Sequence, residues 1–218
     1  MKDRFVYNPR ALTLNPAKFT RKWWAAILCV ATLLLLSSCS PRDYLTRRLA
    51  ADLIAGSDAF RTTQMLQMHT GVLSNKDYLS PDYLALQHKG WISATKANCP
   101  SSVEPPCVDV TLTPAGVDTF QTLVTPGEAE KQFFSIPAAR RELVAVTGIS
   151  KQANVASVEF TWRWASLNEV GAAIYPGDSR YRSSAAFRSY DDGWRVVVGS
   201  VRAGQPLDDA LKNSEPAP

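Results

Sequence analysis

The sequence has few of the residues and motifs on which common catalytic sites depend. Its 218 residues include only two histidines, His69 and His88. It contains no glycine-rich phosphate loop, no His-Glu-x-x-His zinc motif and no Gly-x-Ser-x-Gly nucleophile motif. A hydrolytic triad would need a nucleophile, a base and an orienting acid brought together from distant parts of the chain. These absences predict a protein that is not an enzyme, with no catalytic, cofactor-binding or metal-binding residues.

The sequence also lacks an apolar run long enough for a typical transmembrane helix. The uncharged run from Trp23 to Leu36 has 14 residues, whereas a spanning helix needs about 20. Arg21 and Lys22 precede the run and small residues follow it. A basic flank, a short apolar core and small residues are typical of an export signal. We therefore predict that residues 1–38 form a signal peptide with a long basic leading region.

The end of this segment, Leu36-Ser37-Ser38-Cys39, resembles the lipobox of bacterial lipoprotein precursors. The resemblance implies that Cys39 becomes the lipid-modified first residue and that the chain associates with a membrane through this anchor. In that family an Asp after the cysteine retains the protein at the inner membrane. Ser40 stands here, so the resemblance favours the outer membrane. The alternative is an uncleaved signal anchor, in which Cys39 has no special role.

The basic character of the whole chain comes from the predicted signal segment. Residues 1–38 hold six of the 24 basic residues and one of the 20 acidic residues. Their removal leaves 18 basic and 19 acidic residues, and the net charge changes from +4 to −1. A nucleic-acid partner would need a basic face on the folded body. The composition therefore predicts no nucleic-acid partner.

Cysteine is scarce, and its placement agrees with export. Of the four cysteines, Cys29 lies within the signal segment and Cys39 is the predicted anchor. The remaining two, Cys99 and Cys107, enclose a short proline-containing loop. In an oxidising compartment such a pair predicts a disulfide. The alternative is a reactive or metal-binding pair, but no neighbouring histidine or further cysteine completes a tetrahedral set.

After the anchor, the pattern predicts a helix, then a strand and a loop. Asp43 is placed to cap the helix and Gly56 to end it. The apolar positions of the helix recur at four-residue spacing and are Leu45, Leu49 and Leu53. Residues 60–69 then fit a strand, and residues 71–80 have the composition of a loop.

Residues 80–124 predict a helix, a hairpin and a second helix. Ser80-Pro81 opens the first helix, and Gly90-Trp91-Ile92 ends it and enters a strand. The returning strand leads into Thr113-Pro114, which opens the second helix. This order resembles the recognition helix and wing of winged-helix proteins, and it implies a membrane-tethered regulator as one alternative function. However, the predicted recognition helix offers only His88 and Lys89 as polar side chains that reach toward a DNA groove. These are too few for the phosphate contacts that dominate DNA binding.

Residues 127–130 resemble a linker, and the chain that follows is rich in predicted strands. The strands are expected at 131–136, 142–149, 154–167, 180–190 and 194–201. The last two should pair around Asp191-Asp192-Gly193. The strand at 154–167 alternates, which puts Val158, Phe160, Trp162 and Trp164 on one face. The predicted opposite face bears Glu159, Arg163, Arg182, Arg188 and Arg195. Residues 142–201 resemble the sheet of cystatin-like and nuclear-transport-factor-like folds.

The predicted fold class is α+β. It comprises an N-terminal helix and a winged-helix-like helix-hairpin-helix unit in residues 39–126, then an antiparallel sheet of three or four strands in residues 127–203. Residues 204–218 are polar and predicted to be disordered. The predicted function is that of an envelope-anchored lipoprotein that acts as a binding or scaffold module, with a possible envelope protein as partner. The alternatives are an envelope enzyme with a site around His69 or His88, and the membrane-tethered regulator.

Overall fold

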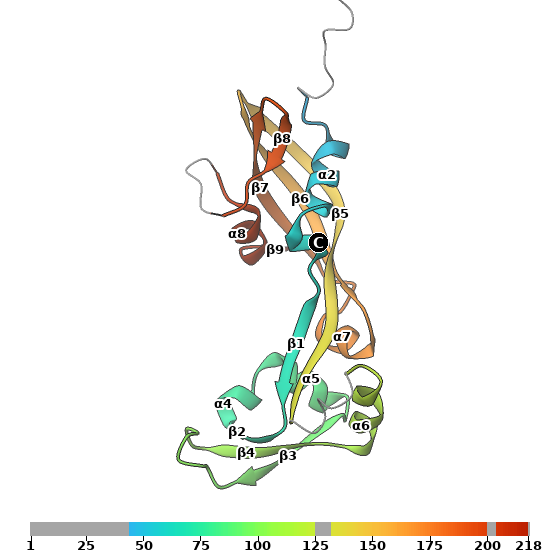
Figure 1. Cartoon of the computed structure of the whole chain (residues 1–218), viewed down its shortest axis with the longest axis vertical. Coiled ribbons are helices and arrows are strands. Elements are labelled where there is room, and N and C mark those ends of the chain that lie inside the picture. The colour runs from blue at the N-terminus through green and yellow to red at the C-terminus, as the bar shows by residue number, and fades with distance from the viewer. Residues whose placement is uncertain (1–43, 125–131, 200–203, 218) are drawn as a thin grey trace, which may run out of the picture. The chain divides into compact units, whose positions relative to one another are not determined.

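The computed structural model describes residues 44–124, 132–199 and 204–217 (Figure 1). The chain divides into units 1–44 and 45–218, and the fold described below is that of the second unit. It contains a six-stranded and a three-stranded sheet whose strand pairs are antiparallel. The predicted mixture of helices and antiparallel sheets is thus confirmed. The signal peptide, Cys39 and the linker 127–130 lie outside the described residues.

Two short helices open the unit, α2 (Arg47–Ala55) and α3 (Asp58–Arg61). The α2 cap is Thr46, whose side chain accepts a hydrogen bond from the Leu49 N–H at 3.1 Å. Gly56 ends α2 as predicted. The most deeply buried positions are Ala50 and Ile54, beside rather than on the predicted leucine stripe. Within the described residues, no helix has the length and apolar character needed to cross a membrane.

The large sheet has more strands than predicted. Its members are β1 (Gln64–His69), β5 (Phe133–Gln152), β6 (Val155–Ser166), β7 (Arg180–Tyr190), β8 (Gly193–Val196) and β9 (Glu215–Ala217). The order is β1-β5-β6-β7-β8, and β9 pairs with β7. The prediction of three or four strands was wrong because β1 and β9 join from outside residues 127–203. Since β1 pairs with β5, strand pairing crosses the predicted boundary at 126/127.

Strand β5 replaces the two strands predicted at 131–136 and 142–149. The intervening Pro137 lacks an N–H and normally interrupts a sheet. Here it lies opposite Met65 of β1, and pairing with β6 begins only at Ala139. The missing donor is therefore tolerated because β5 has a single partner strand at Pro137. The strand then changes partners and continues to Gln152.

The predicted aromatic face of the sheet is largely core. Val158, Phe160 and Trp162 are buried, and α2, α3 and α8 contribute to the same apolar cluster. Trp164 is half-buried against it. The residues predicted on the opposite face are exposed: Glu159, Arg163, Arg182, Arg188 and Arg195. In the described residues Arg163 pairs across the strands with Glu142 at 3.0 Å.

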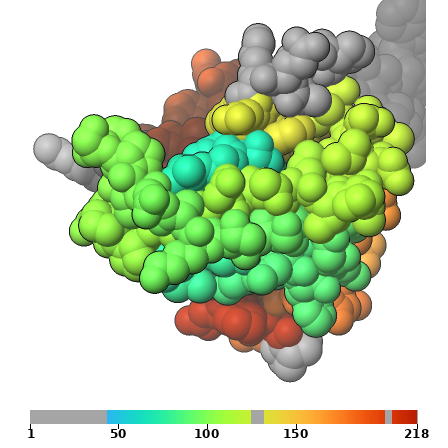
Figure 2. Space-filling model, turned by 90° about the horizontal axis from the view of Figure 1, so that it is seen from below, coloured from blue at the N-terminus to red at the C-terminus, as the bar shows by residue number. Residues whose placement is uncertain are grey.

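The smaller sheet has the order β2-β4-β3 and contains the predicted hairpin. Its strands are β2 (Gly71–Ser74), β3 (Ile92–Ala97) and β4 (Cys107–Leu112). The surrounding helices are α4 (Asn75–Tyr78), α5 (Pro81–His88) and α6 (Pro114–Gln121). Residues 71–80 are therefore not the predicted loop, because Ser74 caps α4 and β2 pairs with β4. Figure 2 shows these segments, in green, over the face seen from below.

The C-terminal segment is ordered between residues 204 and 217, contrary to the predicted disordered tail. It forms α8 (Leu207–Lys212) and β9. The Leu207 N–H donates to the Val197 carbonyl at 2.9 Å, and Leu207 is fully buried. The prediction missed this because Leu207, Ala210 and Leu211 bury only against strands that are distant in sequence.

The predicted disulfide between Cys99 and Cys107 is present. It closes the loop of the β3–β4 hairpin, with the two Cα atoms 5.3 Å apart and eight positions apart in sequence. A covalent link of this kind stabilises a fold mainly because it restricts the unfolded chain.

Replacement of both cysteines, Cys99→Ala with Cys107→Ala, should lower the free energy of unfolding by about 2–3 kcal/mol. The measurement is urea unfolding of the purified full-length chain, followed by circular dichroism. Dithiothreitol should lower the stability of the parent chain toward that of the variant and leave the variant unchanged. A parent chain whose stability is insensitive to the reductant would contradict the prediction.

Candidate functional site

The two histidines singled out in the sequence are exposed at the ends of two elements, His69 in β1 and His88 in α5. The backbone N–H of His69 donates to the Tyr83 hydroxyl, which donates back to the His69 carbonyl, both at 2.9 Å. Among the described residues, neither imidazole has an acid or a hydroxyl as a hydrogen-bond partner. Nor does this part of the chain hold a group of three or more side chains suited to a metal ion.

A different side chain, Arg141 of β5, has an unusual environment. Register places Arg141 opposite Trp164 of β6. Its guanidinium carbon lies 4.8 Å from the ring centroid of Trp164 and 5.5 Å from that of Trp162. Its Nη1 donates to the Ala59 carbonyl at 2.9 Å, just before the end of α3. Two indole rings and one backbone carbonyl therefore fix the position of this cation.

The aromatic residues around Arg141 support one another. Trp162 stacks on Tyr181 with centroids 4.7 Å apart and meets Trp164 edge-on at 5.3 Å. Trp164 in turn contacts Tyr175, with centroids 4.9 Å apart. Two tryptophans at alternate positions of a strand share one face, and Tyr181 lies directly opposite Trp162 on β7. Tyr175 follows α7 (Glu169–Ile174).

A cavity of about 460 Å³ lies at this edge of β5. Three of its lining residues are arginines, Arg61 at the end of α3 and Arg140 and Arg141 of β5; the others are Ala55, Phe60, Glu142 and Leu143. Glu142 is its single lining carboxylate, and it is paired with Arg163. Among the described residues, no carboxylate lies within ion-pair distance of the three arginines. We call this feature the arginine cavity.

Burial shapes the electrostatics beside the arginine cavity. It lowers the pKa of Arg141, while the charges of Asp208 and Tyr175 act in the opposite direction. Arginine nevertheless stays protonated at physiological pH. The Nε of Arg141 is buried and has no hydrogen-bond acceptor among the described residues. Burial also raises the pKa of Tyr175. The cavity is thus a positively charged site beside neutral aromatic rings.

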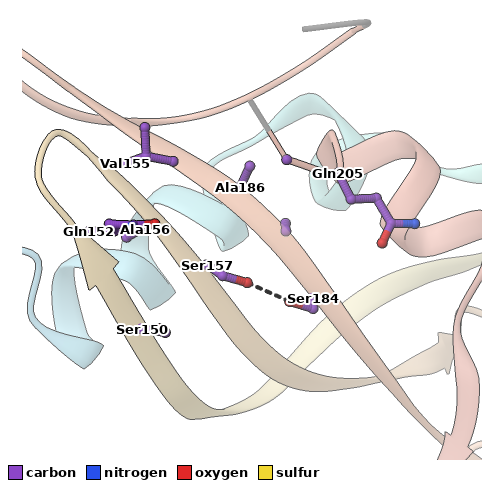
Figure 3. A pocket seen from close by; sticks show the side chains of 10 residues that line it. Ser150, Gln152, Val155, Ala156, Ser157, Ser184, Ala186 and Gln205 are labelled. Carbon is purple, nitrogen blue, oxygen red and sulfur yellow. Dashed lines mark hydrogen bonds between the residues drawn. The ribbon is translucent and has the colours of Figure 1, made fainter. Parts of the chain in front are cut away.

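The other face of the large sheet carries two adjoining hollows of about 220 and 210 Å³. Figure 3 shows residues that line the first of them. Both are lined by Ser184 and by Gln205 of the C-terminal segment. In Figure 3 the hydroxyls of Ser157 and Ser184 face each other, and they are hydrogen-bonded at 2.8 Å. Because these hydroxyls already satisfy one another, the hollows offer a ligand less than the unpaired arginines do. The arginine cavity is therefore the stronger candidate site.

The sequence analysis did not single out the arginine cavity. Arg140 and Arg141 fall between two predicted strands, and Arg61 comes from a helix 79 positions earlier in the chain. The arginines predicted to share a face, Arg163 and Arg182 among them, lie on the opposite side of the sheet from Trp162. The pair Arg140-Arg141 beside two alternating tryptophans is a local signal, but only the pairing of β5 with β6 brings them together.

Comparison with protein-family models, with curated proteins and with solved structures finds no match for this chain.

Proposed function

We propose that this chain is an exported lipoprotein of the bacterial envelope, anchored through Cys39, whose folded body acts as a binding module. The lipobox-like Leu36-Ser37-Ser38-Cys39 supports the anchor. The disulfide between Cys99 and Cys107 supports export, because such bonds persist mainly in oxidising compartments. Ser40 favours the outer membrane over the inner one.

The folded body begins close to the proposed anchor. Seven positions separate Cys39 from Thr46, the cap of α2. Even fully extended, that segment spans at most about 25 Å. A lipid on Cys39 would therefore hold the body near the membrane surface. Two or more acyl chains are needed for a stable anchor.

The observation that carries the binding role is the arginine cavity. Three arginines line one cavity at the edge of β5, and its single carboxylate is already paired. A fold gains little from like charges gathered in this way. A bound anion would balance them, and this favours a binding role for the body.

We further propose that residues 71–121 form a winged-helix-like unit that contacts an envelope protein. Its sheet order, β2-β4-β3 with α4 and α5 between β2 and β3, resembles that of winged helices. Helix α5 presents Leu84, which is 41% exposed, and Leu79 just before it is 53% exposed. Apolar side chains at this position favour a protein partner over a nucleic acid.

Cys39→Ala should abolish incorporation of radiolabelled palmitate and leave the chain at precursor size. The reason is that only a thiol at the processing position accepts the diacylglyceryl group in the family that the lipobox resembles. The assay combines labelling, electrophoresis and membrane fractionation. Cys29→Ala is a matched control in the same segment and should behave as the parent chain. Normal labelling of the Cys39 variant would refute the proposed anchor.

A further inference from the structure

We infer that the arginine cavity binds the phosphate group of a phosphate ester. This inference rests on the proposed binding role and names its ligand class, but it does not depend on the lipid anchor. The cavity is lined by Arg61, Arg140 and Arg141, and Glu142 is held by Arg163 at 3.0 Å. The guanidinium group is planar and presents donors in a fork that matches phosphate oxygens.

Charge favours a phosphate over a carboxylate. A phosphate monoester carries about −1.5 to −2 at neutral pH and has three acceptor oxygens, whereas a carboxylate carries −1 and has two. Three arginines without an acidic partner match the larger charge and the larger number of acceptors. Among the described residues, Glu142 is the single carboxylate that lines the cavity, and it is already paired with Arg163.

One of the three arginines is already positioned. Arg141 is fixed by Trp162, Trp164 and the Ala59 carbonyl. A donor held in place before binding loses little side-chain entropy when the ligand arrives. Arg61 and Arg140 are exposed and can close on the ligand from α3 and β5.

The size of the cavity indicates a ligand larger than phosphate itself. Its volume of about 460 Å³ falls within the range of small-molecule sites. The apolar residues that line it with the arginines are Ala55, Phe60 and Leu143. They suit a carbon skeleton attached to the phosphate. A soluble phosphorylated metabolite and the monoester headgroup of phosphatidic acid share this chemistry.

A purely structural role explains Arg141 but not the whole site. Stacking on two tryptophans and a bond to Ala59 would hold Arg141 in place without any ligand. Among the described residues, Arg61 and Arg140 have no such contacts. A stabilising interaction therefore does not explain why both line this cavity. The test therefore changes these two exposed arginines and leaves Arg141 intact.

The experiment measures binding of glycerol 3-phosphate to the full-length chain in neutral detergent micelles, by tryptophan fluorescence and equilibrium dialysis. The double variant Arg61→Gln with Arg140→Gln should raise the Kd about tenfold or more, because each substitution removes a charge-assisted contact. The matched control, Arg182→Gln with Arg188→Gln, removes the same charge from β7, outside the lining of the cavity, and should change the Kd less than threefold. Thermal unfolding of both variants checks that the fold is retained.

Proteoliposomes distinguish the two sources of the phosphate. If a lipid headgroup is the ligand, phosphatidic acid in the bilayer should compete with glycerol 3-phosphate, whereas phosphatidylcholine alone, a zwitterionic diester, should not. If the ligand is soluble, both membranes should give the same Kd. Either result supports the inference.

Three results would overturn it. They are the absence of binding in both micelles and proteoliposomes, equal losses in the two double variants, and acetate binding as tight as that of glycerol 3-phosphate. The palmitate assay on Cys39 is independent of all of these measurements, so a failed phosphate site and a failed lipid anchor are told apart.

Discussion

Gly116→Ala is expected to lower the free energy of unfolding by about 3 kcal/mol or more. A Cβ at Gly116 would lie 1.9 Å from the carbonyl oxygen of Trp91 and 2.8 Å from the carbonyl carbon. Both are backbone atoms, and the same oxygen accepts the Thr113 N–H at 3.0 Å. Neither the Trp91 carbonyl nor the backbone at Gly116 can move without separating α6 from the start of β3. The close approach therefore requires glycine.

Urea unfolding of the full-length chain tests this prediction. Gly177→Ala is the matched control, because its added Cβ would meet the Trp164 carbonyl oxygen at an ordinary 3.6 Å. The control should change stability by no more than about 0.5 kcal/mol. A Gly116→Ala variant as stable as this control would show that α6 and β3 are not packed as described.

Residues 80–124 could be predicted from the sequence because their helix signals are local. The start signals Ser80-Pro81 and Thr113-Pro114 act locally, because proline in the first turn favours a helix. Thr113 then caps α6 through the Gly116 N–H at 3.1 Å and donates to the Gly90 carbonyl. Likewise, the turn before Gly193 joins β7 and β8 as predicted, although β8 ends earlier, at Val196.

Prediction from the sequence failed for elements whose packing or pairing partners are distant along the chain. Strand β9 is the tripeptide Glu215-Pro-Ala, and no local pattern marks it as a strand until it pairs with Arg180 to Arg182 of β7. Helix α7 lies between the strands predicted at 154–167 and 180–190, where no element was predicted, because its start depends on Asn168. That side chain caps Gly171 and also donates to the Pro137 carbonyl of β5 at 2.7 Å.

The candidate site was invisible for the same reason. Arg61, Arg141 and Trp164 come from a helix and two strands, and each is an ordinary residue within its own segment. They come together only through strand register, because Arg141 faces Trp164 only when β5 pairs with β6. By contrast, the disulfide could be predicted because Cys99 and Cys107 are neighbours along the chain and few alternatives exist.

Gly171→Ala should both destabilise the fold by about 3 kcal/mol or more and disturb the aromatic cluster beside the arginine cavity. A Cβ at Gly171 would lie 1.8 Å from the carbonyl oxygen of Ala138 and 2.7 Å from its carbon. That oxygen also accepts the Leu167 N–H at 2.9 Å. Because the next residue, Ala139, pairs with both β1 and β6, β5 is held in place and α7 must move away from it. Tyr175, directly after α7, should then lose its contact with Trp164.

Near-ultraviolet circular dichroism and tryptophan emission report on this contact, while urea unfolding reports on stability. Gly116→Ala is the matched control, because it costs similar stability but leaves Tyr175 and Trp164 in contact. Gly116→Ala displaces Trp91, which packs on Phe120, so both variants should change the aromatic signal in the folded state. Only Gly171→Ala should weaken glycerol 3-phosphate binding, because Trp164 then no longer holds Arg141 firmly. If Gly171→Ala left the Kd unchanged while folded, α7 would not position the aromatic cluster.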